Sequence, residues 1–140
     1  MNTTVKNILG VIAGVVAGGS VNMGIILISG SVIPPPQGAD VTTMEGLEAA
    51  MHLFEPKHFL MPFLAHAIGT LVGAYIAALI ASTKKMYFAL GVGAWYLLGG
   101  TINVLMLPSP MWFTCVDLIG AYIPMAYLAG KLAMKTTNKG

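Results

Sequence analysis

Residues 58–82 read HFLMPFLAHAIGTLVGAYIAALIAS, an apolar stretch with no lysine, arginine, aspartate or glutamate. A helix of about 20 residues crosses the ~30 Å hydrocarbon core of a bilayer, so this stretch is long enough to span a membrane. Small residues recur in it at every fourth position, at Ala65, Gly69, Gly73 and Ala77. Such series let membrane helices approach one another closely. We therefore expect a membrane helix that packs against other helices along this face.

Three further apolar stretches lie on either side of it, at about residues 8–33, 86–107 and 112–133. The first runs far beyond the roughly 7–15 apolar residues of a signal peptide, so we interpret it as a retained span. The chain of 140 residues is 56% hydrophobic and 9% charged, with a mean hydropathy of +0.81. These features predict one all-α domain over residues 1–140, an integral membrane four-helix bundle with an up-down order of spans.

The lysines predict how the bundle is oriented. With four spans, all lysines except Lys57 fall on one side of the membrane: Lys6, Lys84, Lys85, Lys131, Lys135 and Lys139. Because lysine-rich ends stay in the cytoplasm, we expect cytoplasmic N- and C-termini in a cytoplasmic (inner) membrane, with the connection between the first two spans outside. The chain has no arginine and no basic stripe, which argues against nucleic acid as a partner.

The outer connection is predicted to contain a short amphipathic helix at about residues 43–54, with Thr42 as its N-cap. Its apolar stripe comprises Met44, Leu47, Met51 and Phe54, and a polar strip beside it comprises Glu45, Glu48, His52 and Glu55. Such a helix lies on a membrane surface with its apolar stripe facing down.

The polar strip has two interpretations. The simpler one is a solvated helix face. The other is a site that attracts cations or holds a divalent metal, with His52, Glu55 and His58 as ligands. Glu55 and His58 have the spacing of half a di-metal carboxylate site, but Pro56 interrupts it and the chain has no second copy.

Four polar residues lie at membrane depth, one in each predicted span. Each neighbours small residues, so we expect all four to face other helices. The helical rise places them roughly 6–16 Å below the outer boundary. They are Asn22, His66, Asn103 and Asp117. With His58 and Glu55 at the mouth, they form the candidate site for a ligand or an ion.

His66 and Asp117 are the strongest candidates. An ionisable group at this depth costs at least about 2.5–3.5 kcal/mol when it is charged and unpaired, so it is rarely incidental. The alternative is a hydrogen-bonded pair that only joins two helices. Pro62 and Pro124 each free a backbone carbonyl near these residues, which either binds a ligand or marks a simple kink.

The leading functional hypothesis is a small membrane protein that binds a cation, a proton or a small polar ligand in an outward-facing pocket between helices, as a transporter or channel would. The alternatives are a metal-dependent membrane-embedded enzyme and an accessory or structural membrane subunit. Besides the lipid bilayer, a second copy of the chain is a candidate partner. Gly10, Gly14 and Gly18 form a ridge that serves either such a homo-oligomer or packing within the chain.

Overall fold

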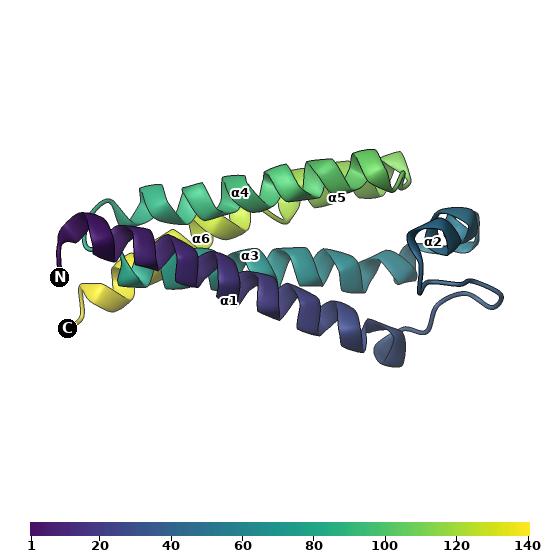
Figure 1. Ribbon diagram of the computed structural model, residues 1–140, viewed down its shortest axis with the longest axis horizontal. Helices are drawn as coiled ribbons and strands as arrows, with labels where there is room; N and C mark the ends of the chain where they lie inside the picture. Colours follow the sequence, from purple (N-terminus) through teal and green to yellow (C-terminus); the bar gives the residue numbers. More distant parts are fainter.

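Four long helical segments run side by side along the molecule (Figure 1). The computed structural model describes residues 1–140. The segments are α1 (Thr3–Val32), α3 (Leu60–Ile80), α4 (Lys85–Met106), and α5 (Met111–Gly120) followed by α6 (Ile123–Thr137). Between α1 and α3 lie α2 (Met44–Ala50) and two 3-10 turns, η1 (Met51–Leu53) and η2 (Pro56–Phe59). The chain has four helical segments long and apolar enough to cross a membrane, which confirms the all-α class and the four predicted apolar segments.

The two ends of the bundle differ. Both termini and the α3–α4 turn lie at one end, here called the terminal end, and α2 lies at the other, the α2 end (Figure 1). At the terminal end the Lys85 Nζ donates to three carbonyls in and just after the last turn of α3, and Asn7 of α1 accepts from the backbone N–H of Ser82 at 2.8 Å. The Lys85 bonds satisfy carbonyls that a helix end leaves without partners. The Asn7 bond joins the turn to α1.

Glycines bring α1 and α3 into backbone contact. Gly10, Gly14 and Gly18 of α1 are buried against α3. A Cβ added at Gly18 would lie 2.5 Å from the carbonyl oxygen of Gly69, and one added at Gly73 would lie 2.7 Å from that of Gly14. A side chain at these positions would push the helices apart. The glycine ridge of α1 therefore packs within the chain.

Alanines join α3, α4 and α6 in the same way. Their small side chains form a fully buried core in the half of the bundle toward the terminal end, with one larger residue, Val92. Its alanines are Ala74, Ala77, Ala78, Ala89, Ala126, Ala129 and Ala133. Toward the α2 end, α1 diverges from α4 (Figure 1). The same four segments therefore form a tightly packed half toward the terminal end and a splayed half toward the α2 end.

The last long segment is not one helix. We expected one span over about residues 112–133, disturbed by Pro124, and the helix breaks at Ala121 and Tyr122, with Tyr122 at φ −113° and ψ −76°. Pro124 stands in the first turn of α6, where it has no N–H to donate to the carbonyl of Gly120. The break therefore follows from the proline predicted to disturb this helix, and it falls just before that residue.

The α2 helix begins one residue later than predicted. Its N-cap is Thr43, whose hydroxyl accepts from the backbone N–H of Gly46 at 3.0 Å. Thr42 instead donates its backbone N–H and its hydroxyl to the Asp40 carboxylate, and these two bonds lower the pKa of Asp40. Helical conformation then continues through η1, so the amphipathic segment covers nearly the predicted range.

Candidate functional site

A cavity of about 470 Å³ lies in the splayed half of the bundle, beneath α2. Residues from all four long segments line it, including the four polar residues singled out from the sequence: Asn22 of α1, His66 of α3, Asn103 of α4 and Asp117 of α5. Its volume lies within the roughly 300–1,000 Å³ of small-molecule sites. The structure thus brings these four side chains to one place, and ligand binding by them stays a prediction.

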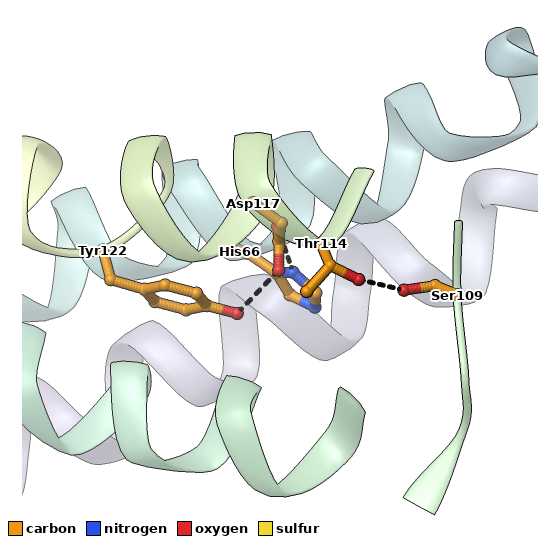
Figure 2. A network of polar contacts seen from close by, with 5 residues as sticks. All are labelled: His66, Ser109, Thr114, Asp117 and Tyr122. Carbon is orange, nitrogen blue, oxygen red and sulfur yellow. Dashed lines mark hydrogen bonds and ion pairs between the residues drawn. The ribbon is translucent and has the colours of Figure 1, made fainter. Parts of the chain in front are cut away.

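His66, Asp117 and Tyr122 form a hydrogen-bonded group in this cavity (Figure 2). The His66 Nδ1 lies 2.8 Å from the Asp117 Oδ1, and the Tyr122 hydroxyl donates to the Asp117 Oδ2 at 3.2 Å. The rings of His66 and Tyr122 stack, with centroids 5.8 Å apart and planes inclined at 26°. Asp117 is only 2% exposed, so its carboxylate depends on these two donors for compensation.

This geometry leaves one imidazole nitrogen for chemistry in the cavity. When the Nδ1 of His66 carries its hydrogen and donates to Asp117, the carboxylate fixes the orientation and tautomer of the ring. The Nε2 then has a lone pair that accepts a hydrogen bond or a proton. His66 is therefore the group best placed to exchange a proton with the cavity, and Asp117 positions it.

Tyr122 was not singled out from the sequence. Its side chain reaches Asp117, five residues earlier, because the helix breaks between them. It also needs Gly100 of α4, where an added Cβ would lie 2.7 Å from the Tyr122 Cζ. Two signals were present in the sequence: Pro124, which disturbs the helix two residues after the tyrosine, and a glycine in the helix that faces it.

Several polar groups of the lining have no partner within the chain. The side-chain hydrogen bonds of the lining join His66 and Tyr122 to Asp117, Tyr96 to the carbonyl of Val15 at 2.5 Å, and Ser109 to Thr114 at 2.9 Å. The amides of Asn22 and Asn103 take no part in them. The hydroxyl of Thr70, one turn after His66, is buried without a partner, which is uncommon for a buried polar atom. These groups are free to bond to a ligand.

Part of the apolar lining comes from the α2 segment. All four residues of its predicted apolar stripe line the cavity: Met44, Leu47, Met51 and Phe54. Phe59 and Phe113 extend this wall, with ring centroids 4.7 Å apart. The stripe therefore covers the cavity as a roof.

Glu55, His58 and His52 lie at the α2 end but do not line the cavity. The backbone N–H of Glu55 donates to the His58 Nδ1 at 2.8 Å, and the Glu55 carboxylate lies 3.4 Å from the Lys57 Nζ. His52 is exposed. No group of three or more histidine, cysteine, aspartate or glutamate side chains is arranged to hold a metal ion. The geometry therefore gives no support to the predicted metal site, and it places Glu55 and His58 in a turn outside the candidate pocket.

No protein-family model matches the chain, and no curated protein or solved structure matches it either.

Proposed function

We propose that the chain is an integral membrane protein with four spans, and that its terminal end faces the cytoplasm. The four apolar segments support insertion. The orientation is supported by the lysines, which all lie at the terminal end except Lys57. In this orientation the α2 end, the acidic connection and the cavity face the outside.

The proposed function is binding of a cation, a proton or a small polar ligand in this cavity, as a step in its transport. The observation that carries the proposal is the buried carboxylate of Asp117, held by two side chains in the wall of a cavity of about 470 Å³. Interhelical hydrogen bonds in membranes contribute only about 0.6 kcal/mol on average, a small return for burying an ionisable group. A role in binding accounts better for its position.

The interrupted helix favours transport over a purely structural role. In membrane transporters, discontinuous helices form substrate sites, because the break frees backbone groups that can bind the ligand. Here the break at Ala121–Tyr122 lies beside the cavity, and Tyr122 itself is part of the lining. The helix break therefore also positions Tyr122 in the wall of the cavity.

The packing supports access from one side. The half of the bundle toward the terminal end is filled by glycine and alanine contacts among α1, α3, α4 and α6, whereas the cavity lies in the splayed half. A ligand would enter from the α2 end. Release to the opposite side would require the tightly packed half to open.

Thermal unfolding of the purified chain in detergent tests the binding function. The probes are Na⁺, K⁺, ammonium, acetamide and benzyltrimethylammonium, each added separately. We expect at least one to raise the unfolding temperature, since a ligand at 100 times its Kd stabilises by about 2.7 kcal/mol. The same probe should have no effect on Asp117→Asn and an unchanged effect on Asp40→Asn, which alters an exposed acid at the same end. Stabilisation by no probe, or equal stabilisation of Asp117→Asn by every probe that stabilises the unaltered chain, would refute the proposal.

Cysteine labelling tests the orientation. Cys115 is the chain's single cysteine, so Cys115→Ser gives a background without thiols. In intact cells, a membrane-impermeant maleimide should label Thr42→Cys and should label Asn138→Cys only after permeabilisation. The reverse pattern would show that the terminal end faces outside.

A further inference from the structure

The size of the cavity indicates what kind of ligand it accepts. A water molecule occupies about 30 Å³ of liquid volume, so a cavity of about 470 Å³ far exceeds what a single dehydrated metal ion or proton requires. We propose that the ligand is an organic cation, an ammonium compound with an apolar body about the size of one or two rings. This inference rests on the proposed binding function and specifies its ligand.

The charge of the lining selects a cation over an anion. Asp117 is the only acid that lines the cavity, and no lysine lines it. When the neutral His66 ring donates its Nδ1 hydrogen to that carboxylate, the pair has a net charge of −1. An anion would meet no fixed positive charge, whereas a cation would partly compensate a carboxylate that only two neutral donors now stabilise.

Aromatic rings select an organic cation over a hydrated inorganic one. Phe54, Phe59 and Phe113 form a continuous wall, with centroids 5.7 Å apart for the first pair and 4.7 Å for the second. Tyr96 and Tyr122 line the same cavity. Faces of aromatic rings attract ammonium groups, most strongly where the site excludes water, and the ring of Tyr122 lies beside Asp117, where the ammonium group would bind. The phenylalanines provide apolar surface for the rest of the ligand.

The polar groups without a partner lie on the long helices and not on the α2 segment, which orients the ligand. The carboxylate and the free amides belong to the long helices, and Thr70 adds an unpartnered hydroxyl there, while the α2 segment contributes only apolar side chains. The ammonium group would therefore point toward Asp117, and the apolar body would lie under the methionine and phenylalanine side chains of the roof.

The surface around the α2 segment provides independent support. It carries Asp40, Glu45, Glu48 and Glu55, all exposed, against one lysine, Lys57, which pairs with Glu55. A cluster of one sign of charge raises the local concentration of ligands of the opposite sign and speeds their association. The acidic surface at the entrance thus favours cationic ligands, as the cavity does.

Isothermal titration of the purified full-length chain in detergent tests the inference with three single-ring compounds of different charge. They are benzyltrimethylammonium, the neutral N,N-dimethylbenzamide and the anionic benzenesulfonate. Tetramethylammonium, which has the charge without the apolar body, is the fourth. We expect benzyltrimethylammonium to bind at least tenfold more tightly than each of the other three. This order is measured on the unaltered protein, so it does not depend on any variant folding.

Two variants localise the binding. Asp117→Asn keeps an oxygen to accept hydrogen bonds, and it should weaken benzyltrimethylammonium at least tenfold while changing N,N-dimethylbenzamide by less than twofold. Phe54→Leu removes apolar surface from the roof and should weaken the cation about two- to fivefold. Phe88→Leu, in a separate groove between α1 and α4, should change nothing.

The outcomes separate this inference from the function on which it rests. Tighter binding of the neutral or anionic compound, tighter binding of tetramethylammonium, or equal binding of the cation to Asp117→Asn would overturn the organic-cation assignment. Binding of K⁺ or acetamide at the cavity would then still support the proposed function. If neither these two nor any of the four compounds bind, both fail.

Discussion

Replacing Gly100 by alanine tests how Tyr122 is held against Asp117. The new Cβ would overlap the Tyr122 hydroxyl oxygen and lie 2.7 Å from the Tyr122 Cζ, so the ring must retreat by at least about 0.7 Å to reach the 3.4 Å of ordinary contact. The hydrogen bond from the Tyr122 hydroxyl to Asp117 is already 3.2 Å long and would be broken by this displacement. Loss of one hydrogen-bond donor to a buried carboxylate lowers the free energy of unfolding by about 1–3 kcal/mol.

The assay is thermal unfolding of the purified chain in detergent, with Gly99→Ala as the matched control. Gly99 precedes Gly100 in α4 and also lines the cavity, but an added Cβ there meets no atom within 4 Å. Each substitution replaces a helix-interior glycine by alanine, and this replacement by itself stabilises a helix by about 0.5–1 kcal/mol. We expect Gly100→Ala to lower the unfolding temperature by about 3–8 °C. Gly99→Ala should leave it unchanged or raise it.

A double-mutant cycle measures how much of this cost depends on the Tyr122 hydroxyl, which is both the atom nearest the added Cβ and the donor to Asp117. In a Tyr122→Phe background the hydroxyl is already absent, so Gly100→Ala should cost less than half of what it costs in the unaltered chain. An equal cost in both backgrounds would show that the hydrogen bond is not what the glycine protects. A Gly100→Ala protein as stable as Gly99→Ala would refute the close contact itself.

Three further predictions concern the rest of the fold. Gly14→Ala should lower the unfolding temperature, because its Cβ would lie 2.9 Å from the nearest side chain of α3, whereas Gly24→Ala, with no atom within 4 Å, should not. Lys85→Met removes three hydrogen bonds to carbonyls at the end of α3, so amide hydrogen exchange there should become faster, and unchanged exchange would contradict the capping role. NMR titration should place the pKa of Asp40 below 3.8, and Thr42→Val should raise it toward 3.8. Because that pKa is lowered in the folded state, its contribution to loop stability is present above pH 3.8 and disappears as the pH falls through the folded-state pKa.

The main features of the fold could be predicted from the sequence because they depend on composition and period alone. Four apolar stretches of sufficient length, separated by prolines and lysines, leave few alternatives to four long helices. The convergence of Asn22, His66, Asn103 and Asp117 could also be predicted. Each lies beside small residues, and small residues mark the faces where helices meet. Both predictions depend only on the spacing of residues along the sequence, because that spacing sets where each residue lies on a helix.

What could not be predicted depends on three-dimensional detail. The Glu55–His58 spacing resembled half a metal site, yet the chain turns there and the His58 Nδ1 accepts from the backbone N–H of Glu55. The role of Tyr122 required the helix to break between it and Asp117. Pro124 predicts a disturbance, but the direction in which the tyrosine then points depends on the space beside Gly100. Such packing between elements leaves no periodic signal in the sequence.

The tight half and the splayed half of the bundle have a common cause in residue size. Where glycine and alanine face one another, the helices meet at backbone distance and leave no room for a ligand. Toward the α2 end, larger and polar residues such as Ile26, Asn22 and Asn103 replace them, and the helices separate around the cavity. The contacts that hold the bundle together at one end thus form the floor of the site at the other. Gly69 lies at this boundary, because it lines the cavity and a Cβ added there would lie 2.9 Å from the carbonyl oxygen of Gly18, so a substitution would alter the floor of the cavity as well as the contact between α1 and α3.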